Sequence, residues 1–265
     1  MDNNILFAFV LTLLAGLSTG IGSAIAFFAK RTNTKFLSVS LGFSAGVMIY
    51  VSFVEILPQA FELVNQAGTE KNDLFVVISF FVGIAFIYLI DILIPSAENP
   101  HEMHRIEEMS ETKVVNNDLK RTGILIALAI GIHNFPEGIA TFASAVVTPE
   151  IGIPIAIAIA IHNIPEGIAV SVPIYYATGS RSKAFWLSFL SGMSEPLGAL
   201  LGFLVIMQFL NNYSLGLLMA AVAGIMVFIS VDELLPGAEK YGHHHYSVTG
   251  FVAGMAVMAI SLLLF

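Results

Sequence analysis

The sequence of 265 residues contains no cysteine, one tryptophan and few charged residues, which make up only 11% of the chain. Without cysteine it forms neither disulfides nor thiolate metal sites, so a bound metal ion must take nitrogen and oxygen ligands. Soluble domains carry about 25% charged residues, and the shortage excludes cytosolic enzymes and secreted modules. The 11 Lys and Arg against 19 Asp and Glu also exclude nucleic acid, because phosphate binding needs a basic surface.

Apolar residues are abundant: they make up 57% of the chain, and the mean hydropathy is +0.85. Since a spanning helix needs about 20 mostly apolar residues, the sequence predicts an all-α integral membrane protein with a single transmembrane domain over residues 1–265. Its eight transmembrane helices are predicted at residues 5–29, 36–57, 74–94, 123–147, 151–176, 184–209, 213–236 and 247–265. The one sizeable loop is 95–121.

The basic residues predict the orientation in the bilayer. Ten of the 11 follow the first, third, fifth or seventh span, and only Lys71 falls in a loop of the other parity. Cytoplasmic loops accumulate Lys and Arg, so we expect loop 95–121 in the cytoplasm and both termini outside. The N-terminus lacks the basic segment of a secretory signal, and we expect the first span to be retained.

An internal repeat predicts the architecture. Residues 133–140 (HNFPEGIA) and 162–169 (HNIPEGIA) agree at seven of eight positions, in neighbouring spans of opposite direction. Residues 45–48 recur as 223–226 at an offset of 178, and weaker matches relate the first span to the sixth and the third to the eighth. These matches predict a 3+2+3 inverted-repeat bundle, in which two inverted triplets of helices flank a central hairpin.

Polar residues that suit metal ions lie near the middle of the predicted fourth, fifth and sixth spans, where a charged side chain costs about 2.5–3.5 kcal/mol. The candidate metal ligands are His133, Asn134, Glu137, His162, Asn163, Glu166 and Glu195. At about 100° per residue, Glu137 lies between His133 and Asn134 on its helix, so its two oxygens can bridge two cations. Imidazole suits Zn²⁺, whereas amide and carboxylate oxygens suit Fe²⁺ or Mn²⁺. We therefore expect two adjoining sites at the membrane midplane.

Prolines accompany both motifs. Pro136 and Pro165 lack a backbone N–H, so the carbonyls four residues earlier lose their helical partner. We expect a kink in each helix just before its histidine, with the freed carbonyls directed at the polar residues.

The paired motifs, the Ser194–Glu195 step and the segment 232–236 (DELLP) together resemble the ZIP (Zrt/Irt-like protein) family of divalent-metal transporters, most closely its bacterial zinc transporters. The resemblance implies a protein of the bacterial inner membrane that takes zinc, and also iron(II), manganese and related ions such as cobalt and cadmium, into the cytoplasm. It implies no enzymatic activity and no cofactor besides the transported ions.

The resemblance also implies how the ligands are divided. The zinc-preferring site takes His133, Glu137, His162 and Glu166, and the adjoining site, associated with iron(II), takes Asn134, Glu137, Asn163, Glu166 and Glu195.

The residues leave alternatives open. A metal ion beside a carboxylate can activate water, as in an intramembrane hydrolase, although the His-x-x-x-Glu spacing differs from that of zinc proteases. A metal-selective channel can use the same ligands as a carrier. Glu55 and Glu233 fit either two mouths of an ion route or solvated helix ends, and His243–His245 fits a metal-collecting tract or a plain loop. A homodimer is one expected assembly.

Overall fold

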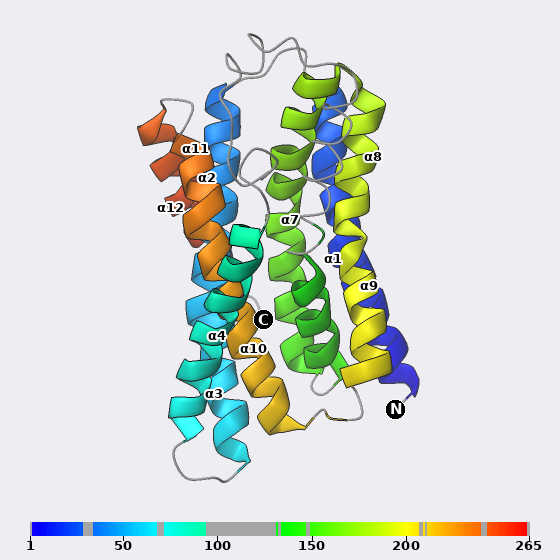
Figure 1. Ribbon diagram of the computed structural model, residues 1–265, viewed down its shortest axis with the longest axis vertical. Coiled ribbons are helices and arrows are strands. Elements are labelled where there is room, and N and C mark those ends of the chain that lie inside the picture. The colour runs from blue at the N-terminus through cyan, green and yellow to red at the C-terminus, as the bar shows by residue number, and fades with distance from the viewer. Residues whose placement is uncertain are drawn as a thin grey trace.

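Every regular element that the structure describes is helical. The computed structural model (Figure 1) describes residues 2–28, 34–67, 72–93, 131, 134–146, 149–206, 209, 211–239 and 243–263. The predicted loop 95–121 and His133 lie outside these residues. The helices are α1 (Asp2–Phe28), α2 (Thr34–Val51), α3 (Leu57–Gln66), α4 (Asn72–Leu93), a helix over 134–146, α7 (Pro149–Thr178), α8 (Arg181–Gly192), α9 (Ser194–Leu201), α10 (Asn212–Ile229), α11 (Leu235–Glu239) and α12 (His244–Leu263).

Six helical stretches among the described residues are long and apolar enough to cross a membrane. They cover Asn4–Ala24, Thr34–Gln66, Asp73–Ile92, Arg181–Val205, Asn212–Glu239 and His244–Leu263, and α7 adds the shorter apolar stretch Gly152–Ile168. Many large apolar side chains on their outer faces are exposed, including Phe81, Phe86 and Leu89 of α4. This surface suits lipid as the solvent. The chain is therefore a multi-pass membrane protein whose described residues are almost entirely helical.

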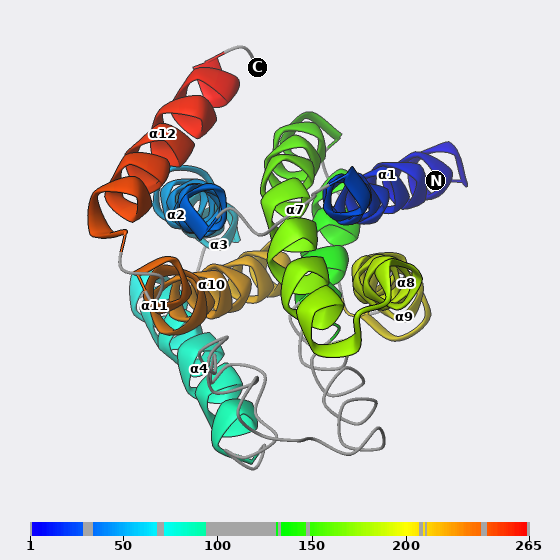
Figure 2. The same ribbon diagram turned by 90° about the horizontal axis from the view of Figure 1, so that it is seen from above.

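The helices form two groups. The first group, here called the site-bearing group, contains α1, α7, α8, α9 and the helix 134–146: α1 packs along α7, α8 and α9, and Gly138 contacts the backbone of Glu195. The second group contains α2, α3, α4, α10, α11 and α12, in which α2 packs on α12 and α10 packs on α3 and α4. Figure 2 shows the two groups on opposite sides, and α2 packs along α7 where they meet.

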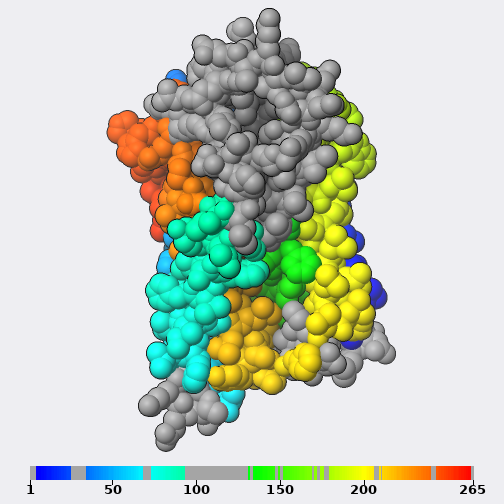
Figure 3. All heavy atoms as spheres, in the orientation of Figure 1, coloured from blue at the N-terminus to red at the C-terminus, as the bar shows by residue number. Residues whose placement is uncertain are grey.

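Figure 3 shows the same division from outside. The surface of α4 lies on one side and that of α8 and α9 on the other, and atoms in the green of the helix 134–146 and the start of α7 lie between them.

Glycines bring the helices of the second group into backbone contact. A Cβ atom on Gly46 of α2 would lie 2.0 Å from the carbonyl oxygen of Phe251 in α12, and one on Gly224 of α10 would lie 2.1 Å from that of Phe80 in α4. No side chain fits at these distances. Small residues of this kind let membrane helices pack closely where lipid removes the hydrophobic driving force.

Two spans widen into π-helices at equivalent points. The segment η1 (Ser52–Ile56) follows α2, and η4 (Ser230–Leu234) follows α10. Each lies just before a proline, Pro58 or Pro236, that cannot donate to the carbonyl four residues earlier. The backbone instead forms wider bonds, from the N–H of Leu57 to Ser52 and from that of Leu235 to Ser230. The two π-helices begin 178 residues apart, at the offset of the sequence repeat.

The structure differs from the predicted sixth span. Residues 184–209 were expected to form one continuous helix, but α8 ends at Gly192 and α9 begins at Ser194. The break has a local cause, because Pro196 cannot donate to the carbonyl of Gly192. The span ends in a further π-helix, η2 (Gly202–Ile206). By contrast, α7 continues through Pro165 without interruption.

Candidate metal centre

Six of the seven predicted ligands lie within the described residues, and all six are buried. Asn134 and Glu137 lie on the helix 134–146, His162, Asn163 and Glu166 lie on α7, and Glu195 lies in the first turn of α9. Their exposed fractions are 5% or less. Burial of this degree is rare for carboxylates unless they are paired or bind a cation. The seventh predicted ligand, His133, lies outside the described residues.

Glu137 and His162 form the first contact between the two repeated motifs. The Nε2 atom of His162 lies 3.3 Å from Oε2 of Glu137, and both side chains are fully enclosed. These residues belong to the predicted zinc-preferring site. The other ring nitrogen of His162, Nδ1, has no hydrogen-bond partner among the described residues.

Asn163 connects three helices. Its Nδ2 donates to the backbone carbonyl of Ala15 in α1, at 2.9 Å, and to a carboxylate oxygen of Glu195 in α9. Because both partners only accept hydrogen bonds, the NH₂ end must face them. The amide oxygen of Asn163 and the second oxygen of Glu195 then remain without a hydrogen-bond partner among the described residues.

Three carboxylates share this region. Glu166 lies against the side chain of Asn134 and within the electric field of Glu137, and Glu195 lies within the fields of both other carboxylates. Glu233, at the π-helix of the second group, also acts on Glu166. Like charges buried at such proximity repel strongly unless a cation or protons neutralise them. A divalent cation held among the three carboxylates would relieve this repulsion.

The ligands meet in pairs rather than in a closed cage. Within the described part of the chain, no three His, Asp or Glu side chains converge on a single point as they would around one metal ion. The pairs are Glu137 with His162 and Asn163 with Glu195. Both offer only nitrogen and oxygen, the ligands of Zn²⁺, Fe²⁺ and Mn²⁺ in proteins that lack thiolates.

Two parts of this geometry were not predicted from the sequence. The break at Met193 places Glu195 at the start of α9, where the helix dipole favours negative charge. Pro196 is the signal that indicates this break. The second part is the carbonyl of Ala15, which orients Asn163; a backbone group of another helix leaves no signal in the sequence.

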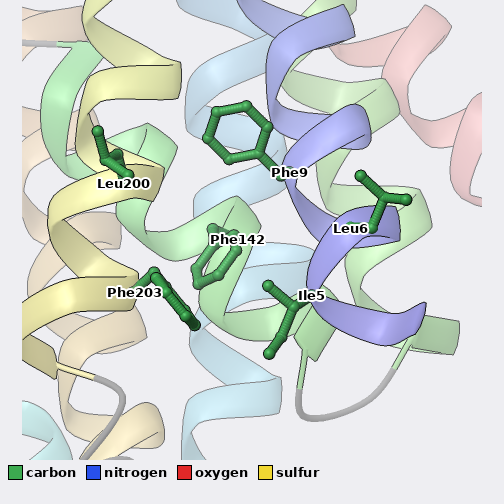
Figure 4. Close-up of a pocket in the computed structure, with 6 residues that line it drawn as sticks. All are labelled: Ile5, Leu6, Phe9, Phe142, Leu200 and Phe203. Atoms are coloured by element: carbon green, nitrogen blue, oxygen red, sulfur yellow. The ribbon is translucent and has the colours of Figure 1, made fainter. Parts of the chain in front are cut away.

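An apolar pocket lies away from these ligands. It has a volume of about 330 Å³ and is lined by Ile5, Leu6, Phe9, Phe142, Leu200 and Phe203. Figure 4 shows that the six side chains come from α1, the helix 134–146 and the α9–η2 segment. None of them offers a ligand atom for a metal ion, so the pocket is not a candidate ion site.

Comparison with known proteins assigns the chain to a family. The family model described as ZIP zinc transporter matches residues 4–91 and 95–262. The chain belongs to the ZIP family. A zinc transporter ZupT of Lysinibacillus sphaericus is 62% identical, over 100% of this chain and 99% of that protein.

Two further ZIP relatives have similar lengths. The zinc transporter ZupT of Clostridium perfringens is 61% identical over 99% of this chain and 97% of its own length, and that of Streptococcus mutans is 59% identical over the full length of both. The family membership makes this chain a membrane transporter and not an enzyme.

Proposed function

We propose that this ZIP protein carries Zn²⁺ into the cytoplasm, and that Fe²⁺, Mn²⁺ and related ions such as Co²⁺ and Cd²⁺ use the same route. The proposal is supported by the buried cluster of Glu137, Glu166 and Glu195, whose negative charges repel one another and would be offset by a bound divalent cation. The carboxylate oxygens of this cluster and the ring nitrogen of His162 beside Glu137 suit these ions. The names of the relatives support zinc as the main substrate.

Two adjoining sites fit the ligand pairs best. We infer a zinc-preferring site around the contact of Glu137 with His162, completed by Glu166 and His133. The second site, open to iron(II), lies around Asn163 and Glu195, with Asn134, Glu137 and Glu166 as its further ligands. Glu137 and Glu166 bridge the two ions. Three carboxylates then face the four positive charges of two divalent ions, so the occupied centre is nearly neutral.

The centre lies between two inverted copies of a helix triplet. We infer eight transmembrane helices in a 3+2+3 inverted-repeat bundle. The similarity of α2 and α10 supports this inverted repeat, because each helix has 18 residues and is followed by a π-helix, and the two π-helices begin 178 residues apart. The close contacts of Gly46 and Gly224, at the same offset, support it as well. Inverted repeats suit alternating access, because the same ligands can face either side in turn.

The setting in the cell follows from charge and family. We infer a single transmembrane domain in the bacterial inner membrane, with both termini outside and loop 95–121 in the cytoplasm. A homodimer is the proposed assembly. The direction of transport, into the cytoplasm, is the one implied by the resemblance to bacterial ZIP transporters.

The decisive experiment measures uptake of radioactive zinc into proteoliposomes. We expect saturable uptake by the wild type, loss of uptake in Glu137→Ala and Glu166→Ala, and competition by iron(II). The matched control is Glu62→Ala, which removes an exposed carboxylate of α3 and leaves uptake unchanged. Equal amounts of folded protein in each preparation exclude a difference in expression.

The same vesicles separate a carrier from a channel. If the protein is a carrier, unlabelled zinc loaded inside the vesicles accelerates the entry of labelled zinc. A channel shows no such counterflow. Binding of zinc without passage in any variant would contradict the proposed function.

A further inference from the structure

A chain of buried hydroxyl groups joins α1, α8 and α7 next to the metal centre. Ser188 of α8 donates to the backbone carbonyl of Gly167 in α7, at 3.0 Å, and accepts from the hydroxyl of Ser23 in α1, at 2.6 Å. Because the carbonyl only accepts, Ser188 uses its one proton there, and Ser23 is then the donor between the two hydroxyl groups. Ser23 shares its own proton with the carbonyl of Thr19, 2.8 Å away. Ser23 and Ser188 are both 0% exposed.

This hydroxyl bridge lies one residue beyond a proposed metal ligand. Gly167 directly follows Glu166, and a Cβ atom on Gly167 would lie 2.2 Å from the carbonyl oxygen of Thr19. One helical turn earlier, Asn163 is tied to the carbonyl of Ala15. Glu166 therefore lies between two points at which α7 is fixed to α1, and the bridge adds α8 to the second point.

The other half of the proposed inverted repeat lacks such a bridge. The first and sixth spans correspond at an offset of 176 residues and the two motifs at an offset of 29 residues. The positions equivalent to Ser23, Ser188 and Gly167 are therefore Ala199, Thr12 and Gly138. Ala199 has no hydroxyl group, and the hydroxyl of Thr12 bonds the carbonyl of Ala8 in its own helix, at 2.9 Å. Close packing of the helices there does not depend on a hydroxyl bridge. The hydroxyl bridge at Gly167 is therefore not needed for close helix packing, which indicates another role for it.

We propose that Ser188 is a positioning residue for metal transport: through the Ser23–Ser188–Gly167 bridge it holds the backbone beside Glu166 and so sets where that carboxylate meets the ion. The proposal rests on the proposed function, since Glu166 acts here as a metal ligand. Partners outside the ligand shell commonly change metal affinity by about 10- to 100-fold when they are lost. A backbone tie one residue away acts less directly, and we expect about a fivefold change.

The test compares zinc uptake kinetics of the wild type and five purified variants in proteoliposomes. Ser188→Ala removes the centre of the bridge, Ser23→Ala removes its outer donor, and a double variant removes both. The matched control is Ser191→Ala on the same helix, because the buried hydroxyl of Ser191 donates to the carbonyl of Ser188 in its own helix and, among the described residues, makes no bond to another helix. Thermal unfolding of each preparation, without metal, reports stability separately.

We expect Ser188→Ala to raise the zinc KM about fivefold with little change in the maximal rate per folded protein, and Ser23→Ala to raise it less. The double variant should match Ser188→Ala, because both changes break one bridge. Ser188→Thr, which keeps the hydroxyl, should restore the KM of whatever fraction folds.

Three results would overturn the proposal: an unchanged KM in Ser188→Ala, an equal rise in Ser191→Ala, or additive effects of the two bridge substitutions. If the wild type carries zinc and Ser188→Ala keeps its KM, only the bridge proposal fails. If the wild type neither binds nor carries zinc, the proposed function fails and the bridge proposal fails with it.

Discussion

The two helix groups both pack closely through glycines, but they differ in the polar side chains that they bury. Among the described residues, the buried polar side chains of the second group are all serines: Ser38, Ser40, Ser44, Ser52, Ser230 and Ser247. The site-bearing group also buries serines and threonines, and it adds three carboxylates, two asparagines and one histidine. Both groups use glycines to bring helix backbones together.

This difference indicates which buried polar residues are needed for helix packing. Ser230 donates its hydroxyl to the carbonyl of Met226 in its own helix, at 2.8 Å, and a small hydroxyl side chain of this kind costs little in the membrane. A buried carboxylate or histidine is expensive. Among the described residues, the second group has no fully buried carboxylate or histidine. Their concentration in the site-bearing group indicates a role other than packing, and we propose that this role is binding of the transported ion.

The largest expected effect comes from removing the only histidine of the described centre. His162→Ala should lower zinc uptake, as kcat/KM, by about 100-fold or more, because it takes away a ligand and leaves Glu137 without its contact. The exposed His244 of α12, replaced by Ala, is the control and should keep wild-type uptake. Equal losses of zinc uptake in His162→Ala and His244→Ala would contradict a special role for the buried histidine of the site-bearing group.

A substitution in the second group should affect stability instead. Gly46→Ala places a Cβ atom 2.0 Å from the carbonyl oxygen of Phe251, and overpacking of this kind costs about 1–3 kcal/mol. We expect a lower thermal midpoint and less folded protein, with an unchanged zinc KM in the protein that folds. Gly202→Ala is the matched control, because its Cβ would lie 3.6 Å or more from its neighbours. A raised KM in Gly46→Ala would show that the second group also shapes the ion site.

A smaller effect should separate the two proposed ion sites. Asn163→Ala removes the amide that joins Ala15 and Glu195 and spares the Glu137–His162 pair. We expect iron(II) to compete about tenfold more weakly, while zinc uptake changes less. The measurement is inhibition of labelled zinc uptake by iron(II) under reducing conditions. Equal weakening for both metals would indicate one shared site.

The smallest effect is expected where the two groups meet. Ser44 of α2 lies 3.4 Å from the backbone carbonyl of His162, at the long limit of a hydrogen bond. Ser44→Ala should therefore change the zinc KM by less than about twofold. A large change in uptake kinetics would mean that this contact couples the groups more strongly than its length indicates.

The membrane-spanning helices could be predicted from the sequence, since hydropathy marks them. The 178-residue offset of the sequence repeat also separates the π-helices that follow α2 and α10, while the full 3+2+3 arrangement stays a prediction. The motifs also indicated which side chains are buried near one another: Glu137 meets His162, and Asn163 meets Glu195. The break at Met193 and the π-helices were not predicted, because a proline does not specify whether a helix kinks, widens or ends. Pro165 leaves α7 continuous, whereas Pro196 accompanies a break.

The tertiary hydrogen bonds were beyond prediction for a different reason. The carbonyl of Ala15 and the Ser23–Ser188 bridge depend on which turn of α1 faces which turn of α7 and α8. Hydropathy does not define that register, because it indicates which segments span the membrane and not which turn of one helix faces which turn of the next. Only the packed structure shows it.

The central claim is that the transported ion lies among the helix 134–146, α7 and α9. Anomalous X-ray scattering at the zinc absorption edge, from crystals of the zinc-loaded protein, tests it most directly. We expect zinc beside Glu137 and His162 and a second position beside Asn163 and Glu195. Zinc bound only elsewhere, with these side chains still in the contacts described above, would contradict it.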